Sequence, residues 1–172
     1  TRLQGDWSSD VCSSDLFRPD FIVGIWRGGS SVGIYVQECL QYLGVETDHI
    51  AIRTSYRGQP SYGSLVDNPE AIRVHGLQYL FENLNRENRL LIVDDVFSTG
   101  YNVEAVIQRL ERQCRNNIPS EVRVAVPYYR PQSNRSGRKP DFYLHETDAW
   151  LVLPYERSEE HTSELQSPCN LV

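Results

Sequence analysis

Short apolar runs alternate with stretches of mixed polarity along the chain. Four of these runs have the length and the β-branched content of strands: FIVGIW (21–26), HIAIRTS (49–55), RLLIVDD (89–95) and EVRVAVPYY (121–129). Two of them, FIVGIW and the LLIV of RLLIVDD, are apolar without interruption, which is typical of strands that are covered on both faces. The sequence therefore predicts a mainly parallel sheet.

The stretches between the runs carry apolar residues at the spacing of amphipathic helices. One stripe ends before Gly44, a suitable C-cap glycine, and a shorter helix is predicted at about 77–85. The two longer stripes consist of Val32, Val36, Cys39, Leu40 and Leu43, and of Val103, Val106, Ile107, Leu110 and Cys114. Strands that alternate with helices form βαβ units, so we expect a single α/β domain with three layers, α/β/α.

Two connections differ from ordinary loops. From Tyr56 to about Arg73 the chain is polar and rich in Gly and Pro, which predicts a long mobile loop. Residues 130–140 form a basic loop. Ligands of parallel sheets bind beyond the carboxyl ends of the strands. Function is therefore expected in the loops after Trp26, Val93, Tyr129 and Leu153.

The two ends of the chain are related to each other. Residues 1–16 and 157–172 can be back-translated into DNA strings that are reverse complements over nearly their whole length. Both ends resemble translated sequencing-adapter DNA; a pair of disordered Ser-rich tails is the alternative. We therefore expect residues 17–156 to be the natural domain, cut at both ends, with its starting Met missing.

Charge and composition exclude several classes of protein. The 172 residues include 17 Lys+Arg, 23 Asp+Glu and no Met. Without the two ends, which hold two basic and six acidic residues, 15 basic and 17 acidic residues remain. The chain has neither a basic face nor an apolar stretch of about 20 residues, so nucleic-acid and membrane partners are not expected. Cys39 and Cys114 are expected to be buried thiols in a reducing cytoplasm.

The strongest chemical signal is the segment LLIVDDVFSTGYNVEAVI (90–107). Two adjacent carboxylates, Asp94 and Asp95, end a strand, and a Ser-Thr-Gly turn then opens a helix. The free N–H groups of a helix start suit a phosphate, and the two acids suit sugar hydroxyls or Mg²⁺. Neither GxxxxGK[ST] nor GxGxxG is present. A plain capped helix and a phospho-acceptor receiver domain are the alternatives.

The motif VDDVFSTG resembles the signature with which type I phosphoribosyltransferases bind phosphoribosyl pyrophosphate (PRPP). That signature joins an apolar strand to two acids and a Thr-Gly phosphate loop, and the family's fold adds a small hood region to the sheet. The resemblance implies that Asp94 and Asp95 are catalytic. It implies PRPP contacts for Asp94, Asp95, Val96, Phe97, Ser98, Thr99, Gly100, Tyr101 and Asn102.

A second segment, GIWRGGSSVG (24–33), is similar to the pyrophosphate loop of the same family. The resemblance implies that Arg27 and the amides of Gly28 and Gly29 bind pyrophosphate, with Arg27 acting in catalysis. It also implies a cis peptide bond between Trp26 and Arg27.

The start of the long polar loop is a third match. Thr54, Ser55 and Tyr56 stand where the family begins the loop that closes over PRPP, so Ser55 and Tyr56 are implied to contact PRPP. The expected cofactor is Mg²⁺, and the resemblance implies Asp95 and Glu156 as its ligands.

The C-terminal part resembles the 6-oxopurine members of the family, closest to the xanthine-guanine type. AVPYYRP (125–131) is similar to a strand whose terminal Lys-Pro contacts the purine 6-oxygen, with Arg130 in the place of Lys. DAWLVLPYE (148–156) is similar to a segment that stacks an aromatic ring on the base. The implied purine contacts are Arg130, Trp150, Leu151 and Glu156. A core aromatic for Trp150 and a solvated cation for Arg130 are the alternatives.

One position departs from the family pattern. The 6-oxopurine enzymes usually have Asp, placed to handle the purine N7 proton, where this chain has Ser98. Serine is a poor proton acceptor at neutral pH. Either water or another carboxylate therefore takes the proton, or the enzyme uses a different nucleobase from the family's norm. Tyr101 and Asn102 also replace the usual small or hydroxylated residues.

The resemblance as a whole implies a purine salvage enzyme in the cytoplasm. It would transfer 5-phosphoribosyl from PRPP to N9 of hypoxanthine, then of guanine or xanthine, and release pyrophosphate. A PRPP-sensing regulator with the same fold and little catalysis is one alternative, and a phosphoribosyltransferase for another base, such as adenine, is a second. The full-length protein is expected to be a homodimer or homotetramer.

Overall fold

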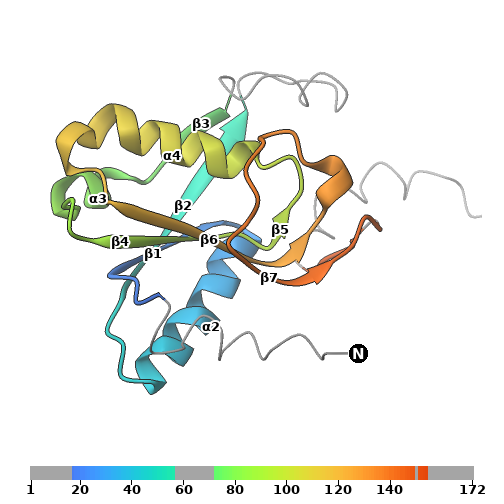
Figure 1. Cartoon of the computed structure of the whole chain (residues 1–172), viewed down its shortest axis with the longest axis horizontal. Helices are drawn as coiled ribbons and strands as arrows, with labels where there is room; N and C mark the ends of the chain where they lie inside the picture. The colour runs from blue at the N-terminus through green and yellow to red at the C-terminus, as the bar shows by residue number, and fades with distance from the viewer. Residues whose placement is uncertain (1–16, 57–71, 150, 155–172) are drawn as a thin grey trace, which may run out of the picture.

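The computed structural model describes residues 17–56, 72–149 and 151–154, which form one α/β domain (Figure 1). Within these ranges a seven-stranded sheet has the order β3-β2-β1-β4-β6-β5, and β7 pairs with β6. The strands are β1 (Phe21–Trp26), β2 (Asp48–Tyr56), β3 (Ile72–His75), β4 (Arg89–Val93), β5 (Val96–Phe97), β6 (Glu121–Tyr129) and β7 (Phe142–Glu146). The helices are α2 (Gly28–Tyr42), α3 (Gln78–Asn83) and α4 (Tyr101–Cys114), with short 3-10 turns at Arg115–Asn117 and Pro131–Ser133.

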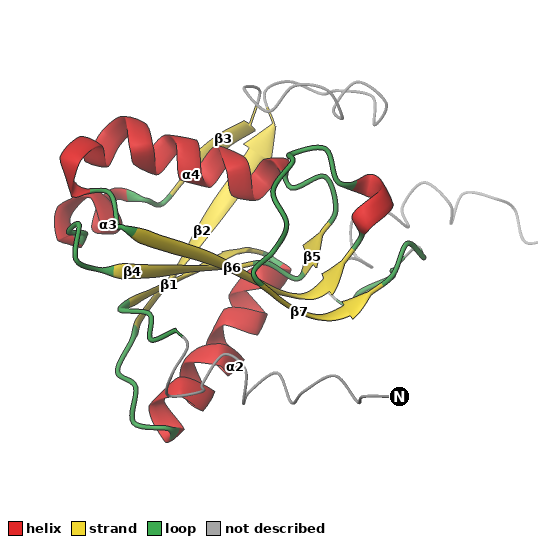
Figure 2. Ribbon diagram, viewed as in Figure 1, coloured by secondary structure: helices red, strands yellow, loops and turns green. Residues whose placement is uncertain are grey.

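Helices cover both faces of the sheet (Figure 2): α2 lies on one face, and α3 and α4 lie on the other. Side chains of β4 alternate between the two sides. Leu90 and Ile92 join the core under α3 and α4, whereas Leu91 and Val93 join the core under α2. This alternation explains the uninterrupted apolar run, because both faces of β4 are buried. The predicted three-layer α/β/α fold is confirmed, with every strand pair parallel except β2–β3.

Helix α2 approaches β1 closely because the residues between them are small. A Cβ atom on Gly24 would stand 2.8 Å from the Cα of Ser30, and one on Gly33 would stand 2.5 Å from Nε2 of His49. The His49 ring therefore lies against the glycines of both elements. Its Nε2 has no hydrogen-bond partner within the described residues, and burial lowers the pKa of His49.

The structure also corrects some predicted boundaries. Helix α2 begins at Gly28, ahead of the stripe that starts at Val32, because its first turn packs through glycine and serine rather than through apolar side chains. The polar stretch predicted as loop up to Arg73 already contains β3, whose Ile72 pairs with Tyr56 of β2. The remainder of that predicted loop, 57–71, lies outside the described residues.

Cys39 and Cys114 are free thiols, as expected, but each is only partly buried. Both ends that resemble adapter sequence lie outside the described residues. None of the helices in the described part is long and apolar enough to cross a membrane.

Candidate functional site

Strand β5 continues β4 after an interruption at Asp94 and Asp95. Val93 pairs with Ala125 of β6, and Val96 pairs with Tyr128, so the register is unchanged across the two acids. The sheet thus carries a buried strand into the Ser-Thr-Gly turn, and the acids occupy the point where the strand is broken. This point lies at the carboxyl end of the parallel strands, where ligands of such sheets bind.

The two acids have different surroundings. Asp94 is buried, and its Oδ1 accepts a hydrogen bond from the Asp95 amide at 3.0 Å. Asp95 is half-buried, and its Oδ1 accepts from the Val96 amide at 2.9 Å. Burial, and then the adjacent charge of Asp95, raise the pKa of Asp94 well above its usual range. A cation or several hydroxyl donors at this position would offset the cost of a buried charge.

The start of α2 lies against the acids. A Cβ atom on Gly29 would stand 2.4 Å from the carbonyl oxygen of Val93 and 3.1 Å from Oδ1 of Asp94. The peptide bond between Trp26 and Arg27 is cis, as expected from the resemblance. The structure therefore brings the predicted pyrophosphate loop and the predicted catalytic acids into one place, although they are far apart in the sequence.

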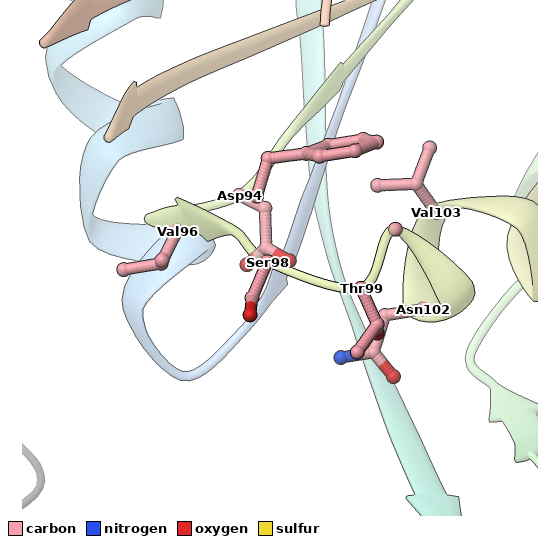
Figure 3. A pocket seen from close by; sticks show the side chains of 8 residues that line it. Asp94, Val96, Ser98, Thr99, Asn102 and Val103 are labelled. Carbon is pink, nitrogen blue, oxygen red and sulfur yellow. The ribbon is translucent and has the colours of Figure 1, made fainter. Parts of the chain in front are cut away.

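The turn after β5 lines an open hollow of about 260 Å³. Figure 3 shows the side chains of Ser98, Thr99 and Asn102 on the same side of the turn that leads into α4. The residues that line the hollow are Asp94, Val96, Phe97, Ser98, Thr99, Gly100, Asn102 and Val103. All of them except Val103 are predicted PRPP-binding residues.

Main-chain donors are available at this turn. Within the described residues, the N–H groups of Ser98, Thr99 and Gly100 donate to no backbone or side-chain acceptor. Gly100 has a φ of 80° and forms the N-cap of α4, and Thr99 Oγ1 accepts from the Tyr101 amide at 3.4 Å. Free amides at the start of a 14-residue helix attract an anion through hydrogen bonds and through the helix dipole.

Asn102 also contributes to the hollow. Its Oδ1 is buried without a hydrogen-bond partner among the described residues. A hydrogen-bond donor in the hollow can therefore pair with this oxygen, whereas the predicted PRPP contact of Asn102, which needs its Nδ2 to donate, stays a prediction.

Arg130 lies directly beyond β6 and next to the turn. Its amide donates to the carbonyl oxygen of Phe97 at 2.9 Å, and its Nη2 donates to the carbonyl oxygen of Asp148 at 3.1 Å. Arg130, the predicted contact of the purine base, is therefore held to β5 by its backbone and to Asp148 by its side chain, rather than being a solvated loop residue.

The structure describes only some of the other predicted site residues. Ser55 lies near the end of β2, where its Oγ is 3.0 Å from Nε2 of His75, and the backbone of Tyr56 ends the same strand. Leu151 is half-buried. Trp150 and Glu156 lie outside the described residues, so their predicted roles stay predictions. No group of three His, Cys, Asp or Glu side chains suitable for a metal occurs in the described ranges.

Sequence reasoning missed one part of the site. The amides of Arg135 and Ser136, in the basic loop after β6, both donate to the carbonyl oxygen of Thr99 at 3.0 Å. The sequence marked this loop only by its charge. No local pattern indicates a contact between segments that are more than thirty residues apart.

Comparisons with known proteins agree with this architecture. The family model described as "Phosphoribosyl transferase domain" matches residues 4–159. A purine phosphoribosyltransferase from Pyrococcus horikoshii superposes with a TM-score of 0.60 at 21% identity, over 87% of this chain and 83% of that one. Hypoxanthine phosphoribosyltransferase from Trypanosoma cruzi, in complex with IMP, gives 0.60 at 15% identity, over 84% and 71%.

A hypoxanthine phosphoribosyltransferase from Staphylococcus aureus gives a TM-score of 0.55 at 13% identity, over 81% of this chain and 66% of that one. A search of curated protein sequences finds no match. At these identities the structural likeness establishes the fold, and the family model spans most of the chain. The chain belongs to the phosphoribosyltransferase family.

Proposed function

We propose that this protein transfers the 5-phosphoribosyl group of PRPP to N9 of a 6-oxopurine and releases pyrophosphate. One observation carries the proposal. Gly29, at the start of α2, packs against Asp94, while the free amides of Ser98, Thr99 and Gly100 lie beyond the same acids. PRPP carries phosphate groups at both ends of a ribose. Two anion subsites that flank a pair of carboxylates match that arrangement of charges.

The proposed roles follow from this geometry. Asp94 and Asp95 accept hydrogen bonds from the ribose hydroxyls, and Arg27 with the amides of Gly28 and Gly29 binds the pyrophosphate. The bond between the anomeric carbon and the pyrophosphate oxygen breaks, the bond to N9 forms, and the purine N7 proton passes to water or to another carboxylate. Catalysis then depends on positioning and on charge neutralisation of the leaving group.

The residues fit Mg²⁺ that arrives with PRPP. Mg²⁺ is usually held by one or two carboxylates together with substrate oxygens, and it keeps several waters. Asp95 is half-buried beside the hollow and suits this role, and Glu156 is the proposed second ligand. When bound, the ion would neutralise charge on the departing pyrophosphate.

The proposed base contacts come from the end of β6 and the segment after β7. Arg130 donates to the purine 6-oxygen, and its anchoring on Asp148 and Phe97 supports a fixed direction. Trp150 stacks on the base, Leu151 offers backbone groups, and Glu156 lies near the 2-position. Hypoxanthine is the first proposed base, followed by guanine and xanthine.

The test is to incubate the protein with Mg²⁺, PRPP and each of hypoxanthine, guanine, xanthine and adenine. We expect nucleotide and pyrophosphate in equal amounts from at least one 6-oxopurine and none from adenine. The double variant Asp94→Asn/Asp95→Asn is the matched control and should be inactive. Product from adenine alone would overturn the proposed base, and a near-normal rate in the double variant would overturn the role of the acids.

Ser98 favours one second candidate, a PRPP-sensing regulator with little catalysis. A serine here supplies no general base, a group that typically contributes about 10²–10⁴-fold in rate. The regulator would bind PRPP with Mg²⁺ but form no nucleotide from any base. Ser98→Asp separates the two candidates: it should raise the turnover of an enzyme that lacks this base, and it should leave a regulator inactive.

We further propose that the full-length protein is a cytoplasmic homodimer or homotetramer. Three large apolar side chains of α2 support an assembly surface, because Ile34, Tyr35 and Tyr42 are 54%, 75% and 90% exposed. Light scattering on the full-length protein tests this: a single monomeric species at micromolar concentration would contradict it.

A further inference from the structure

The turn that lines the hollow (the phosphate loop, residues 96–100) is contacted from its far side by β6 and by residues 130–139 (the supporting loop). The carbonyl oxygen of Asp95 accepts from the Tyr128 amide at 3.3 Å, and that of Phe97 accepts from the Arg130 amide at 2.9 Å. Beyond the sheet, the carbonyl oxygen of Thr99 accepts from Arg135 and Ser136. The carbonyl groups of every second residue, Asp95, Phe97 and Thr99, are thus held by hydrogen bonds from β6 or the supporting loop.

These contacts set the direction of the free amides. In a planar trans peptide, the C=O of one residue and the N–H of the next point in opposite directions. The fixed carbonyl of Phe97 therefore directs the N–H of Ser98 away from β6. In the same way, the fixed carbonyl of Thr99 directs the N–H of Gly100 away from the supporting loop. The N–H groups of Ser98 and Gly100 are therefore oriented by the hydrogen bonds of the preceding carbonyl groups and not by hydrogen bonds of their own.

The supporting loop also packs tightly on the turn. A Cβ atom on Gly100 would stand 2.2 Å from Oγ of Ser136 and 2.8 Å from the Phe97 ring. Position 100 therefore requires glycine for two reasons, its positive φ and the space that Ser136 occupies. The position of Gly100 thus depends on where the supporting loop places Ser136.

One side chain fixes the supporting loop itself. Nδ2 of Asn134 donates to the Tyr129 hydroxyl at 3.3 Å and to the carbonyl oxygen of Arg138 at 2.8 Å. Oδ1 of Asn134 accepts from the amide and from the hydroxyl of Ser136, both at 3.1 Å. Asn134 therefore connects the end of β6 to the residue that contacts Thr99 and Gly100.

We infer that Asn134 and Ser136 are positioning residues for the 5-phosphate of PRPP, acting through the carbonyl of Thr99 and the packing on Gly100. This inference rests on the proposed function. Loss of the Asn134 amide lets the Thr99–Gly100 peptide turn, and the phosphate then loses an aimed donor. The phosphate accepts this hydrogen bond in the ground state and in the transition state alike. Its loss therefore weakens PRPP binding and leaves kcat unchanged.

The test measures Mg²⁺-PRPP binding by titration calorimetry, and steady-state kinetics, for Asn134→Ala and Ser136→Ala. Gln132→Ala, at an exposed position of the same loop, is the matched control. We expect Kd and KM for PRPP to rise about tenfold in both variants, within the loss that a small misplacement can cause, while kcat stays within about twofold. Asn134→Asp, which keeps the volume and the acceptor but loses the two donors, should give an intermediate loss and guards against a misfolded alanine variant.

A second readout does not need PRPP. The ¹H–¹⁵N signals of Ser98 and Gly100 in the free protein should move in Asn134→Ala and stay in place in Gln132→Ala. Unchanged signals together with unchanged PRPP affinity would overturn the inference, as would a fall in kcat with KM unchanged. A wild-type protein that binds no PRPP would instead overturn the proposed function, and the two amide signals would still decide whether the supporting loop positions the turn.

Discussion

Gly29 lies directly against Asp94: a Cβ atom at position 29 would stand 2.8 Å from the Asp94 Cα. The same atom would stand 2.4 Å from the carbonyl oxygen of Val93, which belongs to the backbone and cannot turn aside like a flexible side chain. The start of α2 and the end of β4 are therefore in contact through their main chains. A side chain at position 29 must separate the predicted pyrophosphate loop from the acids.

We expect Gly29→Ala to lower kcat/KM for PRPP about 100-fold, since a displacement near 1 Å can cost that much. Overpacking should also destabilise the fold by about 1–3 kcal/mol. Gly44→Ala is the control, because Gly44 has a φ of 77° and open space around it. Gly44→Ala should lower the free energy of unfolding by about 1–2 kcal/mol through backbone strain and leave kcat/KM for PRPP unchanged. Kinetics for Gly29→Ala within threefold of the wild type would contradict the contact.

Asp94→Asn should raise the thermal stability of the ligand-free protein while it abolishes turnover. Because the pKa of Asp94 is raised in the folded state above the usual value of 3.8, the folded state binds its proton more tightly than the unfolded state does. Stability is therefore lost as the pH rises through that raised pKa. Asparagine imitates the neutral acid, so Tm at pH 7 should increase by about 2–4 °C for each kcal/mol recovered.

Scanning calorimetry of both proteins at several pH values checks this expectation. The gain should shrink as the pH falls, because the wild-type carboxyl is then protonated as well. An equal difference in Tm at every pH, or a lower Tm for the variant at pH 7, would show that the buried charge carries no cost.

His49 should make the fold sensitive to mild acid. Burial between Gly24 and Gly33 lowers the pKa of His49, so the unfolded state binds the proton more tightly. Stability is thus complete above the ordinary histidine pKa of 6.5 and falls as the pH drops below it. In urea unfolding, the wild type should lose more stability between pH 7 and pH 5 than His49→Gln does. Parallel pH profiles for the two proteins would contradict this assignment.

Arg130→Gln should lower the efficiency with which the purine base is used and leave the affinity for PRPP unchanged. If Arg130 donates to the 6-oxygen, its loss should lower kcat/KM for the purine about 10–100-fold, the cost of one or two charged hydrogen bonds. The Kd for PRPP should stay within about twofold. Arg109→Gln, at an exposed position of α4, is the control for a general loss of positive charge. A larger effect on PRPP than on the base would move Arg130 into the phosphate subsite.

The sequence predicted the buried strands more accurately than any other part of the fold. The bounds predicted for β1 and β6, 21–26 and 121–129, agree with the structure to the residue. Strands like these are marked by apolar side chains on both faces and by turn residues at both ends, so the signal is local. The acid pair, the Thr-Gly turn and the glycines after β1 were likewise visible, because each belongs to a short contiguous motif.

Features that depend on partners distant in the sequence were not predictable. The first turn of α2 carries no apolar signal, and it is helical because small residues let it approach β1 and β4. Strand β3 has only four residues and forms by pairing with β2. Ser136 joins the two loops through a main-chain hydrogen bond to Thr99 and through packing at the missing Cβ of Gly100, and neither contact is marked by composition or spacing.

The unbroken register from β4 to β5 has a consequence for how ligands can be detected. The phosphate loop is an extension of a strand whose residues Leu90, Leu91, Ile92 and Val93 are fully buried. Amides of such a strand exchange their hydrogens with solvent only when the domain opens as a whole. A ligand that binds the folded state alone lowers the equilibrium population of the open state by the factor 1 + [L]/Kd, and exchange slows in proportion. Hydrogen exchange at the centre of the sheet therefore reports occupancy of the loop at its edge, whichever base or phosphate is bound.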